Sequence, residues 1–189
     1  GNTFFDKLGV TQTYVQLTVP STSTASVTGN TFHASGLDVP IQLVGDALAA
    51  SLAISGNTFP EGAGAGPLIT GTLSASATLA TVSGLSPLVS GLSVASGGTL
   101  AIPVGFAATV SALSVQSGGA LTVASGAVVS APTGGSTQIV VSGTVSATSA
   151  TFDRIRFDFS SSGTRTLTSC SFAVPSGLYA VSAAGGTLD

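Results

Sequence analysis

Charged side chains that could carry out chemistry are concentrated in one short stretch, residues 153–159, where charged and apolar residues alternate. The period of two of a β-strand would turn the apolar residues inward and expose Arg154, Arg156 and Asp158 on one face. Asp158 could then act as an acid or bind a cation beside Arg156, and Arg165 could join them from an adjoining segment. We favour a solvated, salt-bridged strand face instead, because the preceding segments carry no charge to complete a catalytic groove. No catalytic residue is assigned.

Other residue types used in catalysis or metal binding are scattered. Asp38, Asp46 and Glu61 lack the regular acidic spacing of a calcium-binding loop. His33 has no second histidine in the chain to form a metal site with. Cys170 is the only cysteine, and no histidine lies near it in the sequence to activate its thiol. The sequence therefore predicts neither a metal site nor a cofactor.

The composition limits the classes of partner. Hydrophobic residues make up 43% of the 189 residues and charged residues only 6%, with a formal net charge of −3. No charged residue lies between Glu61 and Asp153. Without a basic patch, neither nucleic acid nor an anionic membrane surface is an expected partner. Every apolar run is interrupted by Ser, Thr, Gly or Pro well before the roughly 18 residues of a membrane-spanning helix, so no membrane insertion is expected.

A six-residue phrase recurs along the chain, with the pattern apolar, hydroxyl, small, variable, hydroxyl, apolar. Most copies follow one another after about 20 to 28 residues, a spacing typical of one turn of a solenoid. The copies are Gly1 to Phe4 (truncated), Val27 to Phe32, Ile54 to Phe59, Val89 to Val94, Val110 to Val115, Ala147 to Phe152 and Leu167 to Phe172. Between them the chain contains short β-branched runs and no convincing amphipathic helix, which predicts an all-β fold.

The phrase also predicts how each turn bends. Its two apolar ends have opposite parity, so a straight strand could not bury both. The small third position therefore falls at a bend that requires a positive φ or a close backbone approach. The fourth position should point inward, where stacked side chains form a structural ladder. The proposed ladder residues are Asn2, Asn30, Asn57 and Cys170.

The Gly-Asn-Thr-Phe phrases resemble those of right-handed parallel β-helix proteins of the pectate-lyase-like type. The segments Ser96 to Leu100 and Ser117 to Leu121 are similar to repeats of large bacterial or archaeal surface and adhesin proteins. This resemblance implies an extracellular or cell-surface location. It also implies an alternative function, because related enzymes act on polysaccharides from an outer strand. The corresponding face for binding or degrading a surface glycan would be Arg154, Arg156, Asp158 and Arg165.

We expect residues 1–189 to form one right-handed β-helix domain of seven to nine turns. Joining one chain's end to another's start, Leu188 and Asp189 before Gly1 and Asn2, restores the repeated phrase. The sequence therefore predicts that these residues are one unit of a longer array, formed either by tandem repeats in a longer chain or by copies that associate head to tail through their terminal coils. The expected function is that of a non-enzymatic, self-assembling subunit of an extracellular fibre, stalk or cell-surface layer.

Overall fold

The chain winds into a coil of short parallel β-strands. The structure, a computed structural model, describes residues 3–5, 13–33, 39–59, 66–81, 85–160 and 164–183. In this part of the chain the one helix is a short 3-10 helix, η1 (Gly45–Ala49), and every strand pair is parallel. Each strand pairs with its counterpart one coil later. The prediction of an all-β parallel solenoid is therefore confirmed.

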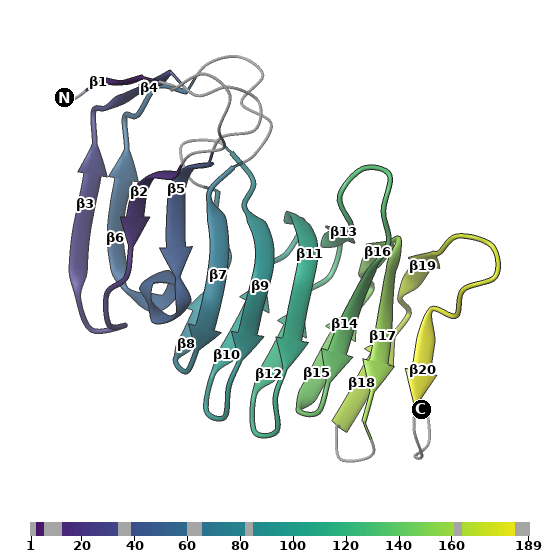
Figure 1. Cartoon of the computed structure of the whole chain (residues 1–189). Helices are drawn as coiled ribbons and strands as arrows, with labels where there is room; N and C mark the ends of the chain where they lie inside the picture. Colours follow the sequence, from purple (N-terminus) through teal and green to yellow (C-terminus); the bar gives the residue numbers. More distant parts are fainter. Residues whose placement is uncertain are drawn as a thin grey trace.

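One face of the coil, which we call the front face, runs the whole length of the molecule (Figure 1). Its strands lie side by side, and the two described ends of the chain lie at opposite ends of the row. In spatial order the front strands are β2 (Thr13–Leu17), β5 (Val39–Val44), β7 (Leu68–Leu73), β9 (Leu88–Val94), β11 (Ala107–Val115), β14 (Thr137–Val141), β17 (Ile155–Phe159) and β20 (Val181–Ala183).

A second sheet of five strands, the back sheet, closes the coil behind the front face. Its strands are β8 (Ser76–Thr78), β10 (Thr99–Ile102), β12 (Ala120–Val123), β15 (Thr144–Thr148) and β18 (Thr164–Thr168). The levels with hydrogen-bonded strands on both faces give about five turns, and the predicted seven to nine turns are not confirmed.

The N-terminal coils form a separate part of the back wall. There β3 (Thr24–Thr28) and β6 (Ser51–Ser55) pair with each other in a two-stranded sheet, which is not hydrogen-bonded to β8. The helix η1 lies between β5 and β6 in the chain, beside this break in the wall (Figure 1). The back of the coil is therefore divided, whereas the front face is continuous.

Short strands follow the corner after the back sheet. Near the N-terminus, β1 pairs with β4 so that Thr3, Phe4 and Phe5 align with Thr31, Phe32 and His33. In the later coils the corner strands join the front face through the long strand β11. The corner strands are β1 (Thr3–Phe5), β4 (Thr31–His33), β13 (Val128–Ser130), β16 (Thr151–Asp153) and β19 (Ser171–Ala173).

A single apolar core fills the inside of the coil along its length. Alternate residues of each strand point into it, as the period of a β-strand requires, and in β17 Ile155, Phe157 and Phe159 are fully buried. Aromatic rings stack at both ends of the core. Phe32 lies 5.1 Å from Phe59, and Phe152 lies 5.0 Å from Phe172, between ring centres.

Candidate functional site

The repeated phrase forms a corner between the back wall and the corner strands. Its third position has a positive φ in both N-terminal copies, 65° at Gly29 and 64° at Gly56. Two serines adopt the same left-handed conformation in later copies, with φ of 48° at Ser149 and 53° at Ser169. Backbone hydrogen bonds connect this column from coil to coil, for example from Gly29 N to the carbonyl of Ser55 and from Ser149 N to that of Thr168.

Asn30 and Asn57 meet at this corner and bind each other. The Oδ1 of Asn57 accepts hydrogen bonds from the backbone N of Asn30 at 3.0 Å and from its Nδ2 at 3.1 Å. The Nδ2 of Asn57 donates to the carbonyl of Val27 at 2.7 Å. Because Asn30 is only 8% exposed, these bonds satisfy polar groups that would otherwise be costly to bury.

The corner column changes character toward the C-terminus. Cys170 follows Ser169 at this corner, is half-buried, and lies one coil beyond the fully buried Ala150. Its Sγ is 3.5 Å from the carbonyl oxygen of Thr168. Asn2, Gly1, Leu188 and Asp189 lie outside the described residues.

Two corners of the same column were missed by the sequence pattern. Gly105 and Gly126 have φ of 67° and 72° and are connected by backbone hydrogen bonds to the next corner, as the phrase glycines are. Their fourth-position residues are Phe106 and Ala127. In contrast, the copies at residues 89–94 and 110–115 lie within β9 and β11 on the front face, where the register shifts between paired residues.

The predicted charged face is divided by the fold. Arg156 and Asp158 do lie together, half-buried on the outer side of β17, and Gln138 of the neighbouring β14 connects them. Arg156 Nη2 donates to Gln138 Oε1 at 2.7 Å, and Gln138 Nε2 donates to Asp158 Oδ2 at 2.6 Å.

Arg154 acts within the corner rather than on the face. It has a φ of 57°, and its guanidinium donates to the carbonyls of Pro132 and Ala131 at 3.1 and 3.0 Å. It also forms a salt bridge of 3.1 Å with Asp153. These bonds satisfy carbonyl oxygens of the turn one coil earlier, which makes Arg154 a structural residue.

Arg165 lies on the opposite wall of the coil. In β18 it alternates with exposed threonines and shares the inward side with Leu167. Its guanidinium lies 4.9 Å from the ring centre of Phe159 and donates through Nη2 to the carbonyl of Ser160 at 2.8 Å. Arg165 therefore packs on the core aromatic residues and does not join Arg156 and Asp158.

A groove of about 290 Å³ lies over the Arg156 and Asp158 pair. Gln138 and Ser182 line it from the adjacent strands, and the loop before β20 adds Tyr179, which is 83% exposed. Neither Tyr179 nor Gln138 was predicted from the sequence to belong to a site. Tyr179 could have been noticed as one of only two tyrosines, but its position beside β17 depends on how the last coils stack.

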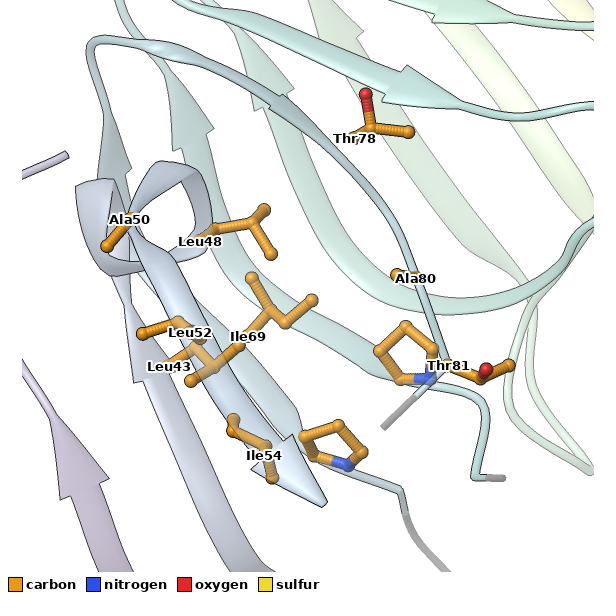
Figure 2. Close-up of a pocket in the computed structure, with 11 residues that line it drawn as sticks. Leu43, Leu48, Ala50, Leu52, Ile54, Ile69, Thr78, Ala80 and Thr81 are labelled. Atoms are coloured by element: carbon orange, nitrogen blue, oxygen red, sulfur yellow. The ribbon is translucent and has the colours of Figure 1, made fainter. Parts of the chain in front are cut away.

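A second depression, the apolar cleft, lies where the back wall is divided. It has a volume of about 260 Å³, and Figure 2 shows Leu43, Leu52, Ile54 and Ile69 in it, with Leu48 of η1 above them. Thr78, Ala80 and Thr81 form the opposite side. The side chains that line the cleft are mostly aliphatic, with the hydroxyl groups of Thr78 and Thr81 on the opposite side.

Asp46 connects the helix η1 to the turn between β7 and β8. Its carboxylate accepts hydrogen bonds from the Oγ and N of Ser74, both at 2.6 Å, and from the N of Ala75 at 3.1 Å. The hydrogen bond from the Ser74 hydroxyl is the main cause that lowers the pKa of Asp46, and both backbone N–H groups act in the same direction. Asp38 and Glu61 lie outside the described residues.

Among the described residues, no group of three or more His, Cys, Asp or Glu side chains is placed to hold a metal ion. The same part of the chain contains no helix long and apolar enough to cross a membrane.

Comparison with known proteins returned no match to a protein-family model, to a curated protein or to a solved structure. The resemblance to pectate-lyase-like and adhesin proteins is thus supported at the level of the parallel β-solenoid and no further.

Proposed function

We propose that the protein is a non-enzymatic structural subunit that stacks end to end into an extracellular fibre, stalk or cell-surface layer. The observation that carries this proposal is that both ends of the coil offer strand edges of the same kind. Among the described residues, β1, β2 and β3 at one end and β18, β19 and β20 at the other pair on one side only. Open edges of parallel sheets are templates for pairing with another chain.

The aligned residues of the corner strands are of the same type at the two ends of the coil. At the N-terminal end Phe4 aligns with Phe32, and at the C-terminal end Phe172 aligns with Phe152, all at the last position of the phrase. If β19 of one copy paired with β1 of the next, phenylalanine would follow phenylalanine without a break. Such a contact is heterologous and does not close on itself, so it generates a filament.

The surface chemistry favours a structural part over a catalytic one. The outward positions of β15 are all Ser or Thr, and Ser or Thr also faces outward from β9 and β12 beside small or aliphatic residues. This central part of the coil carries no charge. A flank of this kind would let neighbouring solenoids pack side by side without charge repulsion. Together with the resemblance to surface-protein repeats, this supports an extracellular or cell-surface location. The right-handed sense that we propose for the coil rests on the resemblance to parallel β-helix proteins.

Electron microscopy of the purified chain tests the proposal. The axial repeat should equal the length of the front face from β2 to β20 plus one strand spacing to the next copy. At about 4.8 Å per strand, this gives filaments with a repeat of about 40 Å, the length of the seven to nine coils that we propose for the unit. Monomers without filaments at every concentration, shown also by sedimentation, would refute it.

A matched pair of variants in β20 sharpens the test. Phe157 N donates to the carbonyl of Ala180 at 2.9 Å, so in a parallel ladder the N–H of Ala183 points away from β17, toward a following copy. Ala183→Pro should abolish filaments while the subunit stays folded. Ser182→Thr should leave them intact.

A further inference from the structure

The groove beside Tyr179 combines a hydrogen-bonded network of side chains with an exposed aromatic ring. In the network, Gln138, Arg156 and Asp158 are connected by hydrogen bonds of 2.7 and 2.6 Å. The ring of Tyr179 is exposed to solvent. Gln138 holds both charged groups, which fixes their positions before any ligand arrives.

The hydrogen-bonding capacity of the groove is only partly used. The network employs one of the five N–H donors of Arg156 and one of the two carboxylate oxygens of Asp158. Donors and acceptors therefore alternate along the groove over a few ångströms. A ligand that matches them must itself present closely spaced groups that both donate and accept, as hydroxyl groups do.

The charge of the groove selects against ions. Arg156 and Asp158 are the two charged groups that line it, and their formal charges cancel. An anion would meet the carboxylate of Asp158, and a cation would meet the guanidinium of Arg156. A neutral ligand with a flat apolar face and many hydroxyl groups fits both the network and the exposed ring.

We propose that this groove binds an uncharged saccharide, which stacks on Tyr179 and forms hydrogen bonds with Gln138, Arg156 and Asp158. The site is formed by outward-facing side chains of β14 and β17 and by the loop before β20. All of these residues belong to one subunit, so binding by a single subunit does not require the proposed end-to-end stacking.

Calorimetric titration with three neutral hexasaccharides, of β-linked glucose, mannose or N-acetylglucosamine, tests this proposal, with trigalacturonate as the acidic comparison. We expect at least one neutral hexasaccharide to bind with a Kd below about 1 mM. No binding of any of them in that range would overturn the proposal. Binding of trigalacturonate in preference to all three would overturn the assignment to an uncharged sugar.

Variants of the exposed ring locate the site. Tyr179→Ala should weaken binding about tenfold, because the stacking surface is lost, whereas Tyr179→Phe keeps the ring and should stay within about threefold of the original affinity. Val104→Ala is the matched control, since Val104 is also highly exposed but lies at a distant corner. Equal affinities for Tyr179→Ala and the original protein, with circular dichroism unchanged, would show that this groove is not the site.

Discussion

The corner of the coil is stabilised in two different ways at its two ends. Near the N-terminus, Asn30 and Asn57 hold the corner by three hydrogen bonds between their amides and the backbone. Near the C-terminus, Ala127 and Ala150 occupy the same column and are fully buried without any polar side-chain group. The left-handed backbone conformation that precedes them is the same in both regions.

The difference follows from how well each region is covered. The inward residues of β6 in the divided N-terminal wall are only half-buried, whereas those of β12 are fully buried. Where apolar burial is incomplete, an amide ladder provides the missing cohesion. Where the core is continuous, small apolar residues suffice and a polar group would be a cost. One backbone corner therefore tolerates opposite side-chain chemistries, depending on its surroundings.

Placing asparagine at the apolar corner positions should have the largest effect on the free energy of unfolding. Ala150→Asn places an amide in a fully buried apolar position without the partner that Asn30 has in Asn57, so we expect a loss of about 2 to 4 kcal/mol in the free energy of unfolding. Urea unfolding measures it. Adding Ala127→Asn should recover part of the loss by creating a ladder, and a strictly additive double variant would argue against this account.

Removing the ladder should have a smaller effect on stability. Asn57→Ala deletes all three hydrogen bonds, including the one from the backbone N of Asn30, which should cost about 1 to 3 kcal/mol. Ser55→Ala, at an exposed position of the same corner, is the control and should change the free energy of unfolding by less than about 0.5 kcal/mol. Equal losses in urea unfolding would show that the ladder does not work as described.

The corner and the charged strand show how far the sequence alone could predict this fold. The phrase at residues 27–32 predicted a bend with a small residue at its third position, and Gly29 adopts the expected positive φ. In the copy at residues 89–94, Gly91 also has the expected positive φ, of 72°, but it lies inside β9 at an irregular register of the strand and not at the corner. A six-residue pattern cannot tell these settings apart.

The candidate site was less predictable, for a physical reason. As alternation predicts, Ile155 and Phe157 point inward, and Arg156 and Asp158 lie half-buried on the outer side of β17. The contributions of Gln138 and Tyr179, and the inward position of Arg165, depend on which residues of successive coils align. Because the coils differ in length, that alignment is set by packing between coils and not by any local sequence signal.

Replacing a serine of the C-terminal corner by glycine should have a moderate effect on the free energy of unfolding. Ser149 adopts a φ of 48°, a conformation that costs about 1 kcal/mol for a residue with a Cβ atom. Ser149→Gly should therefore raise the free energy of unfolding by up to about 1 kcal/mol. Ser146→Gly, in the neighbouring strand β15, should instead lower it, since a strand glycine only adds entropy to the unfolded chain. A loss of stability in both variants would contradict the assigned strain.

The hydrogen bonds of Asp46, which connect helix η1 to the turn between β7 and β8, should make the smallest contribution to stability. Hydrogen bonds lower the pKa of Asp46 in the folded state below that of the unfolded chain, about 4, so its contribution to stability is complete above that value. The contribution is lost as the pH falls through the lower, folded pKa. In Asp46→Asn, the midpoint temperature of thermal unfolding should therefore fall less steeply at acidic pH than in the original protein. The same pH dependence in both proteins would show that Asp46 does not contribute in this way.

End-to-end continuation of the corner column is tested most directly by cross-linking. Thr3 aligns with Thr31, and Ser171 aligns with Thr151, at the same position of the phrase. In the proposed stack Ser171 of one copy lies beside Thr3 of the next, about 4.8 Å away between Cα atoms, within the range of about 4.4 to 6.8 Å for a disulfide. Both residues would be changed to cysteine in a Cys170→Ala background.

The control pair, Thr3→Cys with Thr31→Cys in the same background, should close a disulfide within one chain and so show that this column accepts the bond. For the pair Thr3→Cys and Ser171→Cys, our account predicts a ladder of disulfide-linked multimers on a non-reducing gel after mild oxidation. Monomers alone, under conditions in which the control pair closes completely, would contradict it.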